Sequence, residues 1–249
     1  MGPSLAVVTG TSSGIGLAVA QELLQRGWSI VGISRRPAPI THANYTQMCL
    51  DLGDTATLLA AVDEQVGTRV SDPAVSRLGL VNNAALVGLL GTVEHMDPNE
   101  LLRVYAVNVV APAALMGWML RRRHGAAAMR IVDVSTGAAV RALPGMAAYA
   151  SSKAALRMLG MVLGTELELP QPDGSPRRDV SLLSFEPGMV DTAMQTDVRT
   201  RDPEVLPIVG WFKAAEQEGK LVSPALPARA IADYLESDGQ PSFREERLT

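Results

Sequence analysis

The sequence predicts an α/β protein, with one domain built on a doubly wound parallel sheet that carries helices on both faces. Short apolar runs alternate with longer amphipathic stretches along the 249 residues, which is the pattern of repeated βαβ units. The short runs are almost continuously apolar, as expected of strands covered on both faces. No linker, internal repeat or low-complexity segment interrupts this alternation, so residues 1–249 are expected to form a single domain.

Six strands and six helices are expected in alternation. The strand candidates are the apolar runs 5–9, 29–34, 46–51, 78–82, 130–135 and 180–185. The helical candidates, in which apolar residues recur every three or four positions, are 15–26, 54–67, 97–122, 148–168, 202–218 and 225–237. The polar stretch 170–179 is interpreted as a surface loop.

The longest segment between a strand and the next regular element is interpreted as a substrate lid. It spans about 190–222 and is rich in proline and glycine. In doubly wound sheets, ligands bind outside the carboxyl ends of the strands. A long insertion at that edge is therefore a candidate for a segment that covers a substrate.

Charge and cysteine content narrow the classes of function. The formal net charge of −4 provides no basic field for nucleic acid, so a nucleic-acid partner is not expected. The single cysteine, Cys49, excludes an internal disulfide framework and fits a reducing compartment. We therefore expect a cytoplasmic protein with Cys49 as a small buried side chain. The histidines His42, His95 and His124 lack ligand spacing, so surface positions and no metal site are predicted.

The uncharged run 104–120 is apolar enough to be weighed as a membrane span. It contains Asn108 and Pro112 and is shorter than the roughly 20 apolar residues that a span needs. A buried helix, or one that packs against a partner subunit, is expected instead, so no membrane association is predicted. The first residues of the chain do not resemble a signal peptide, and none is expected. Together with the apolar run 154–164, it suggests helices that pack across a two-fold axis in a homodimer or homotetramer.

Three glycines between the first strand and the first helix predict a phosphate site. Gly10 permits the tight turn, and Gly14 and Gly16 remove side chains where the backbone must approach a ligand and pack on the sheet. The helix N-terminus then offers free N–H groups and a partial positive charge to phosphates, and Ser12 and Ser13 add hydroxyl donors. In a Rossmann-like sheet this turn is where a dinucleotide binds.

Residues after the second and third strands indicate which dinucleotide is bound. Ser34, Arg35 and Arg36 follow the second strand, where an acidic residue would bind the ribose 2′-hydroxyl of NAD. Arginine instead matches a 2′-phosphate by charge and by its forked donors, which favours NADP(H); the alternative is a solvated surface pair. Asp51 lies where it could hydrogen-bond an adenine amino group. The alternative is that Asp51 caps the N-terminus of the next helix, but Asp54 suits that role better.

A second group of residues predicts proton-transfer chemistry at the same edge of the sheet. Tyr149 and Lys153 are four residues apart at the start of a helix and so share one face. An ammonium beside a phenol favours the phenolate and lowers its pKa, which suits an acid or base near neutrality. Ser135 and Thr136 end the fifth strand, and Asn108 is a polar residue in an otherwise apolar helix.

With these residues in this order, the chain resembles the short-chain dehydrogenase/reductase family over essentially its whole length. The matching motifs are Thr9-Gly10-x-x-x-Gly14-Ile15-Gly16, Asn82-Asn83-Ala84, Asn108, a hydroxyl residue at 135 or 136, Tyr149-x-x-x-Lys153 and Pro187-Gly188-x-Val190-x-Thr192.

The resemblance implies roles for these residues. Tyr149 would exchange a proton with the substrate oxygen, and Lys153 would hold the nicotinamide ribose and lower the pKa of the tyrosine. A Ser or Thr hydroxyl would orient the carbonyl, and Asn108 would anchor a water that links Lys153 to solvent. The cofactor would further contact Ile15, Leu52, Asn83, Ala84, Ala85, Pro187, Gly188, Val190 and Thr192.

The chain departs from the family pattern at three places. Ala85 stands where the family usually has glycine, which adds a methyl group beside the cofactor. The family's usual spacing of thirteen residues before the tyrosine falls on Thr136, which we favour as the orienting hydroxyl, with Ser135 as the rival. The glycine-rich ending common in the family's last strand is absent, and the chain ends SFREERLT.

Within the family, the chain looks most similar to the sepiapterin reductase and benzil reductase branch. The stretches that carry this likeness are TGTSSGIG, GISRRP, 190–199 and 212–231. The function expected is therefore an NADPH-dependent carbonyl reductase for a small-molecule α-dicarbonyl or sepiapterin-like substrate. Met189, Met194 and Trp211 are expected to line the substrate pocket. The alternatives are an NADP(H)-dependent alcohol dehydrogenase, a 3-oxoacyl reductase, and a dinucleotide sensor without catalysis.

Overall fold

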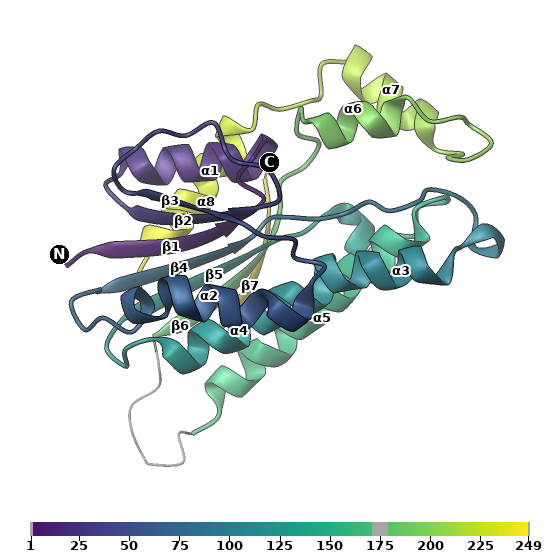
Figure 1. Ribbon diagram of the computed structural model, residues 1–249. Helices are drawn as coiled ribbons and strands as arrows, with labels where there is room; N and C mark the ends of the chain where they lie inside the picture. Colours follow the sequence, from purple (N-terminus) through teal and green to yellow (C-terminus); the bar gives the residue numbers. More distant parts are fainter. Residues whose placement is uncertain (1, 171–178, 249) are drawn as a thin grey trace.

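The computed structural model describes residues 2–170 and 179–248, which form one parallel sheet between two layers of helices (Figure 1). The seven strands lie in the order β3-β2-β1-β4-β5-β6-β7, and every neighbouring pair is parallel. The order reverses between β1 and β4, which is the switch point where doubly wound sheets bind ligands. The predicted α/β fold class is confirmed.

The strands and helices follow the predicted alternation closely. The strands are β1 (Ser4–Thr9), β2 (Ser29–Ser34), β3 (Tyr45–Cys49), β4 (Arg77–Asn82), β5 (Ala128–Val134), β6 (Val180–Glu186) and β7 (Phe243–Arg247). The helices are α1 (Gly14–Gln25), α2 (Thr55–Val70), α3 (Pro98–Tyr105), α4 (Ala111–Arg122), α5 (Ala147–Glu168), α6 (Ala193–Arg199), α7 (Val209–Gln217) and α8 (Ala225–Glu236).

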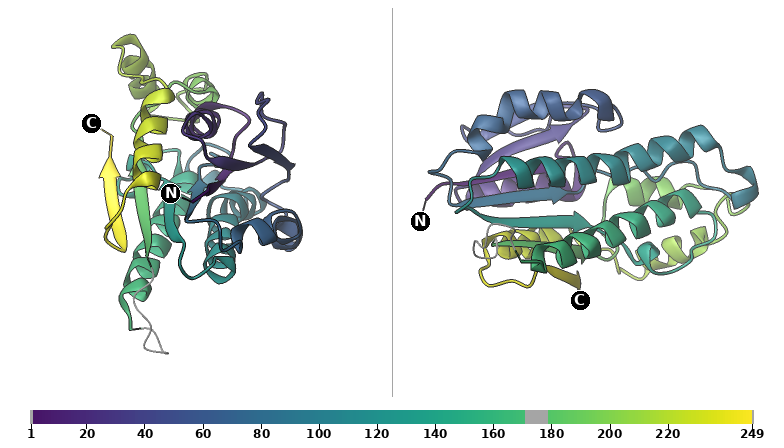
Figure 2. Two further views of the ribbon diagram at one scale, coloured as in Figure 1. Left: turned by 90° about the vertical axis from the view of Figure 1, so that its left-hand side faces the viewer. Right: turned by 90° about the horizontal axis from the view of Figure 1, so that it is seen from below.

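Each face of the sheet has its own hydrophobic core. Helices α1 and α8 cover one face, and α2, α4 and α5 cover the other (Figures 1 and 2). Val8 and Val132 point toward α1 and α8, whereas Val7 and Ile131 point toward the other layer, as strand alternation requires. Both cores are built mainly from Val, Leu, Ile and Ala, in keeping with strands that are buried on both sides.

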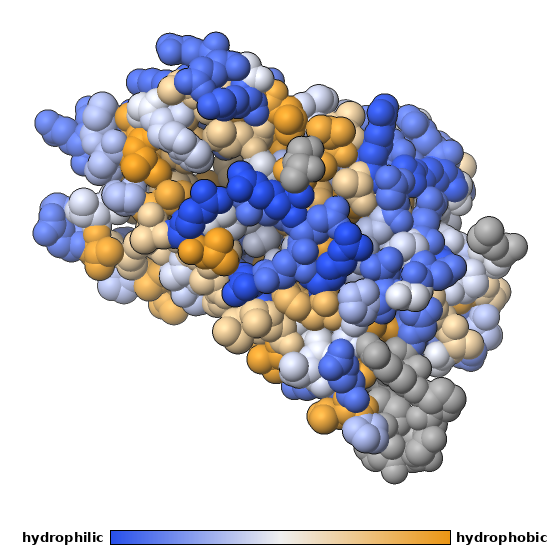
Figure 3. All heavy atoms as spheres, turned by 180° about the vertical axis from the view of Figure 1, so that it is seen from behind, coloured by the Kyte–Doolittle hydropathy of each residue, from blue (hydrophilic) through white to orange (hydrophobic). Residues whose placement is uncertain are grey.

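The strand prediction omitted β7, which pairs with β6 at the edge of the sheet. Its sequence, FREER, is charged and its residues are exposed or half-buried, so it lacks the apolar run by which strands are found. Figure 3 shows the molecule from behind Figure 1, where a hydrophilic band crosses the surface between hydrophobic patches. A charged edge strand is also a common protection against pairing with another sheet.

Two of the predicted helices are interrupted. The expected helix 97–122 is divided by a π-helical turn, Ala106–Val110, between α3 and α4. The expected helix 202–218 begins only at Val209, because Pro203 and Pro207 lack the N–H groups that a helix interior needs. The short helix α6 was not predicted, since its seven residues show too little periodicity.

The two ends of the segment interpreted as a lid are hydrogen-bonded to each other. Val190 and Val222 form an isolated parallel bridge, with Asp191 N donating to Val222 O at 2.9 Å and Val222 N donating to Met189 O at 2.9 Å. Helices α6 and α7 lie between these two points. They project beyond the carboxyl ends of the strands, opposite α3 (Figure 1).

Several smaller expectations have different outcomes. Cys49 is exposed at the end of β3, so its predicted burial is wrong; β3 is an edge strand, and its last residue faces solvent. His42, His95 and His124 are exposed, as predicted. In the described part of the chain, no group of three His, Cys, Asp or Glu residues could hold a metal. Most of the predicted loop 170–179 lies outside the described residues.

One helix in the described chain, Pro98–Arg122, passes a test for a membrane span by length and composition alone. In its apolar window, 44% of the residues are buried inside the protein. Leu115 and Met119 belong to the core below the sheet. A helix of a protein core passes the same test, so this result by itself carries little weight.

Candidate active site

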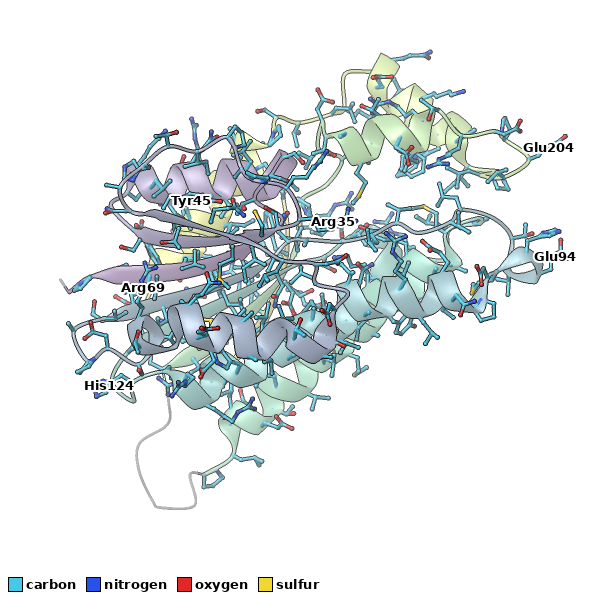
Figure 4. All side chains as sticks on the ribbon, in the orientation of Figure 1. Arg35, Tyr45, Arg69, Glu94, His124 and Glu204 are labelled. Carbon is cyan, nitrogen blue, oxygen red and sulfur yellow. The ribbon has the colours of Figure 1, made fainter. Side chains whose placement is uncertain are left out.

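A cavity of about 800 Å³ opens at the carboxyl ends of the strands, where the sequence predicted a site. Figure 4 shows Arg35 at this end of the sheet and His124 at the opposite end. Every predicted catalytic, cofactor and substrate residue lines the cavity except Gly16 and Asn108. Those two lie behind its wall, and both are fully or nearly fully buried.

The glycine turn has the geometry that was expected of a phosphate cradle. Gly10 and Gly14 have φ angles of 77° and 59°, in the left-handed region that favours glycine. A Cβ atom on Gly16 would lie 2.4 Å from both Asn83 Nδ2 and Gly10 O, so only glycine allows this packing. Ser13 occupies the N-cap of α1 without a side-chain hydrogen bond to the helix, which leaves the first N–H groups free for an anion.

The opposite wall of the turn is held by Thr9 and Asn83. Thr9 Oγ1 accepts hydrogen bonds from Asn83 N and Ala84 N, both at 3.0 Å. Asn83 Nδ2 donates to Thr9 O at 2.9 Å. These bonds tie the end of β4 to the end of β1 and place Ala84 and Ala85 on the cavity wall.

Ser34 positions the backbone of the arginine segment from below. Its hydroxyl donates to Arg36 O at 2.7 Å and accepts a hydrogen bond from Gln47 Nε2 at 3.2 Å. Tyr45 hydrogen-bonds both Thr11 and Gln47. The sequence analysis did not identify this polar support, because Thr11, Tyr45 and Gln47 form no recognisable motif.

The arginines themselves face the cavity without an internal partner. Arg35 and Arg36 are exposed, and within residues 2–170 and 179–248 neither forms an ion pair. Asp51 and Leu52 line the same end of the cavity, and Asp51 Oδ1 accepts a hydrogen bond from Gly53 N at 2.9 Å. Asp54 stands at the N-cap of α2 but makes no side-chain cap; its carboxylate accepts from the Thr57 hydroxyl.

Tyr149, Thr136 and Lys153 line the same cavity. The Thr136 hydroxyl lies close enough to the Tyr149 phenol to lower its pKa, and the Lys153 ammonium lies 6.0 Å from the centre of the tyrosine ring. Lys153 Nζ donates to Val134 O at 2.7 Å and is 3% exposed. Thr136 also accepts a weaker bond from Ala138 N at 3.3 Å. The hydroxyl beside the phenol therefore belongs to Thr136, and Ser135 lines the cavity next to it.

The pKa of Tyr149 differs from the expectation. Burial raises the pKa of the phenol to about 12, and the hydrogen bond from Thr136 offsets this only in part. Burial lowers the pKa of Lys153 to about 8, while nearby Asp133 acts in the opposite direction. In this arrangement the expected lowering of the tyrosine pKa by Lys153 is not seen, because desolvation of the phenolate is the larger effect.

Asp133 is a buried carboxyl group that the sequence analysis missed. It faces Asn82 across the β4–β5 pair, and Asn82 Nδ2 donates to Asp133 Oδ1 at 2.8 Å. Asp133 Oδ2 and Asn82 Oδ1 are buried, and no partner for either is found in the described chain. Burial raises the pKa of Asp133 to about 6, against the lowering effects of Asn82 and Lys153. The only feature of the sequence that could have revealed Asp133 is that it is a charged residue within an apolar strand.

Asn108 joins the cavity wall to α5 from behind. Its Oδ1 accepts from Leu86 N at 2.8 Å, and its Nδ2 donates to Leu86 O at 2.8 Å and to Ser152 Oγ at 2.9 Å. It lies within the π-helical turn and is fully buried. All hydrogen-bonding groups of its side chain are thus used, and its role in holding a water stays a prediction.

The lid segment supplies apolar side chains to the cavity. Met189, Met194 and Trp211 line it as predicted, and the rings of Trp211 and Phe212 lie edge to face at 4.9 Å. Gly14 faces Thr192 across the opening, where an added Cβ atom would lie 3.2 Å from the threonine methyl. Cavity residues that the sequence analysis did not select include Leu86, Val87, Arg141, Leu143, Met146, Glu186, Ile208 and Arg247.

Comparison with known proteins agrees with this geometry. The family profile described as short chain dehydrogenase matches residues 4–203, most of the chain. The chain belongs to the short-chain dehydrogenase/reductase family. As a member, it is an oxidoreductase acting on CH–OH or C=O groups with a nicotinamide dinucleotide, and the free N–H groups, glycine turn and cavity fit such a cofactor.

Curated relatives place this short-chain dehydrogenase near two named activities. It is 30% identical to "Benzil reductase ((S)-benzoin forming)" of Bacillus cereus, over 97% of this chain and 98% of that protein. It is 28% identical to "Sepiapterin reductase" of Xenopus tropicalis, over 97% of this chain and 95% of that protein. The likeness to this branch of the family, expected from the sequence, is confirmed.

Solved structures of dehydrogenases share the fold. One from Saccharomyces cerevisiae superposes with a TM-score of 0.81 at 23% identity, covering 98% of this chain and 96% of that one. The aldohexose dehydrogenase of Thermoplasma acidophilum gives a TM-score of 0.78 at 20% identity, covering 99% and 92%. At these identities the comparison supports the fold alone.

Proposed function

We propose that the protein is an NADPH-dependent carbonyl reductase that acts on an α-dicarbonyl or sepiapterin-like compound. The observation that carries this proposal is one cavity that is lined by Tyr149, Thr136 and the buried Lys153 and that also presents Arg35 and Arg36. The relatives named for benzil and sepiapterin reduction support the substrate class.

NADP(H) would be held by the glycine turn and the residues around it. The free N–H groups of α1, with Ser12 and Ser13, suit the pyrophosphate, and Arg35 and Arg36 suit a 2′-phosphate. Asp51 and Leu52 lie at the adenine end. Asn83, Ala84, Ala85, Pro187, Gly188, Val190 and Thr192 complete the wall toward the nicotinamide. The bound cofactor supplies the hydride.

Side chains of the protein orient the carbonyl oxygen of the substrate and supply its proton. Thr136 donates a hydrogen bond that orients the oxygen, and Tyr149 gives it a proton as negative charge develops there. Lys153, fixed by Val134 O, holds a positive charge close to the phenol. Because the pKa of Tyr149 is raised to about 12, the phenol carries its proton at neutral pH, as a proton donor must.

The decisive experiment measures cofactor oxidation with a panel of carbonyl compounds. Purified protein is given NADPH or NADH with α-diketones, pterins, β-keto thioesters and simple ketones, and loss of cofactor absorbance is followed. Turnover of α-diketones with NADPH is expected. No turnover of any carbonyl would refute the reductase proposal, and preference for β-keto thioesters would favour a 3-oxoacyl reductase instead.

We also propose that the protein forms a homodimer or homotetramer through the helices below the sheet. Met158 and Val162 lie one turn apart on α5 and are 54% and 44% exposed, with Leu159 beside them at 37%. An apolar stripe on a long helix is suited to packing against the same helix of a second copy across a two-fold axis.

A further inference from the structure

Three charged side chains line the cavity near Thr136 and have no part in the proton chemistry: Arg141, Glu186 and Arg247. Arg141 follows the 3₁₀ turn Gly137–Ala139, Glu186 ends β6, and Arg247 ends β7. Glu186 and Arg247 are register partners in the parallel pair of β6 with β7. The sheet and one loop thus bring together residues that are far apart in the sequence.

Both arginines lie close to the same carboxylate oxygen without a tight bond to it. Arg247 Nε is 3.4 Å and Arg141 Nη2 is 3.8 Å from Glu186 Oε1. A charge-assisted hydrogen bond is shorter, at about 2.7–2.9 Å. The structure forms such bonds elsewhere: Arg122 binds Asp63 through two contacts of 2.6 and 2.8 Å. The pairs at Glu186 are therefore loose by the standard of this same protein.

Most donors of the two guanidinium groups remain free. The side chains of Arg141 and Arg247 are 57% and 59% exposed, and neither makes a hydrogen bond to any part of the chain that the structure describes. Each guanidinium has five N–H donors in a fixed fork. With Glu186 counted, the group carries one net positive charge at the cavity wall.

The cationic group lies beside Gly137, the residue that follows Thr136, and lines the same cavity. Gly137 directly follows Thr136, and a Cβ atom on it would lie 3.0 Å from Arg141 Nη2 and 2.9 Å from Glu186 Oε1. Glycine at 137 thus makes room for the guanidinium and the carboxylate next to the reacting centre. Elsewhere on the substrate side, apolar residues line the cavity: Leu143, Met146, Met189, Trp211 and Phe212.

From this arrangement we propose that Arg141 and Arg247 bind a carboxylate on the substrate, so that the protein reduces 2-oxo acids with an apolar or aromatic side group. The inference rests on the proposed reductase function and deepens it, since a 2-oxo acid is itself an α-dicarbonyl compound. Glu186 lies near both guanidinium groups and competes with the substrate carboxylate for them.

The reaction balances without any further reactant. The keto carbon gains the hydride from the reduced nicotinamide, and the keto oxygen gains the proton of Tyr149, which is replaced from solvent. The carboxylate is unchanged, and the product is a 2-hydroxy acid. The arginines therefore act in binding and orientation and not in the transfer of electrons or protons.

The test compares benzoylformate with its methyl ester, which have the same keto group and differ in charge. Because an ester makes the keto carbon more electrophilic, the informative quantity is the ratio of kcat/KM for the acid to that for the ester. In Arg141→Ala and in Arg247→Ala this ratio is expected to fall by about tenfold or more, as the loss of a charged hydrogen bond requires. The change should lie mainly in KM.

A variant expected to change the ratio in the opposite direction separates carboxylate binding from structural damage. Glu186→Gln removes the competing carboxylate and is expected to raise the acid-to-ester ratio, whereas general damage to the cavity would not raise it. Arg103→Ala, an arginine of similar exposure (55%) on α3 that does not line the cavity, is the matched control and should leave the ratio unchanged.

The possible results are distinct. A ratio that stays within about threefold of the wild type in both arginine variants would overturn the carboxylate proposal while the reductase function stood. A lower ratio in Glu186→Gln would also overturn it. If the wild-type protein reduces neither compound nor any neutral α-diketone, the proposed function itself fails.

Discussion

Lys153 donates a hydrogen bond to the main-chain oxygen of Val134 at 2.7 Å, from a side chain that is only 3% exposed. The bond joins the first turns of α5 to the end of β5, and so it sets the distance between Tyr149 on the helix and Thr136 after the strand. An ammonium group held in this way has lost most of its water, which is why burial lowers the pKa of Lys153 to about 8.

Tyr149→Phe is expected to lower kcat by about 10²- to 10⁴-fold, because the phenol is the proton donor. Binding of NADPH, measured by the fluorescence of the bound nicotinamide, should stay within a few-fold of the wild type, since the ring remains. Substantial activity in this variant would refute the assignment of Tyr149 as the proton donor.

Removal of the two neighbouring hydroxyls separates their roles. Thr136→Ala should reduce kcat much more than Ser135→Ala, because Thr136 lowers the pKa of the Tyr149 phenol and Ser135 has no such effect. Equal losses in the two variants, or a larger loss in Ser135→Ala, would assign the orienting hydroxyl to Ser135 instead.

The rate of carbonyl reduction is expected to fall as the pH rises through about 8. The ammonium of Lys153 is present below its pKa of about 8 and is lost above it, while Tyr149 keeps its proton up to a pKa of about 12. The limb of the pH profile between about 7 and 10 therefore reports on the lysine. Measurement of kcat/KM across this range checks the prediction, and a flat profile would contradict it.

Asp133→Asn is expected to stabilise the protein at neutral pH. The pKa of Asp133 is raised from 3.8 to about 6, so the folded state binds more protons than the unfolded state between these values, and stability is lost as the pH rises through this window. The asparagine also offers a donor to the unpartnered Asn82 Oδ1. The gain in the free energy of unfolding should be about 1–3 kcal/mol at pH 7.

In Asp133→Asn, the effects on stability and on activity depend on pH in different ways. At about pH 4 the carboxyl of the wild type carries its proton, so the stability difference measured by denaturant unfolding should be much smaller there. Loss of the negative charge should lower the pKa of Lys153 further and move the fall in activity to lower pH. Lower stability of Asp133→Asn at pH 7 would show that the ionised carboxylate is well compensated.

Arg35→Ala and Arg36→Ala are expected to raise KM for NADPH by about 10- to 100-fold through loss of a charged hydrogen bond to the 2′-phosphate. The ratio of kcat/KM for NADPH over NADH is the quantity to measure, because NADH lacks that phosphate. Arg69→Ala, on α2, is a control. An unchanged ratio in both cavity variants would remove the basis for NADP(H) preference.

Met158→Glu combined with Val162→Glu is expected to dissociate the proposed oligomer, since two charges would be buried in an apolar interface. Light scattering coupled to gel filtration gives the mass directly. Val93→Glu, at a residue that is 70% exposed in the 3₁₀ turn Val93–His95, is the control for a surface charge. A wild-type protein that is monomeric at micromolar concentration would refute the proposal.

The sequence predicted the sheet and most of the cavity because both depend on strong local patterns. Buried parallel strands are runs of apolar residues, and their carboxyl ends are fixed by topology, so residues after a strand can be assigned to one edge. The glycines of the first turn and the pair Tyr149 and Lys153 lie at such positions. Among the strands of the described residues, only β7 escaped detection, because an edge strand can be charged along its length.

What the sequence could not give depends on contacts between distant segments. Arg247, Glu186 and Arg141 come together through the pairing of a strand that shows no apolar pattern. The pKa of Tyr149 was expected to be lowered by its charged neighbour, and burial has the larger effect. Burial of a single polar group is set by tertiary packing, which helical spacing does not reveal.

The bridge between Val190 and Val222 brings the two ends of the segment 190–222 together beside the sheet. The entropy of closing that excursion depends only weakly on its length, at roughly 0.6 kcal/mol for each doubling. Changes in length within the segment would therefore cost the sheet little, as long as Thr192 beside Gly14 and the residues that pack with Met146 and Tyr149 are kept. We expect the length of this excursion to vary among related enzymes, which offers a route to new substrate specificity on one sheet.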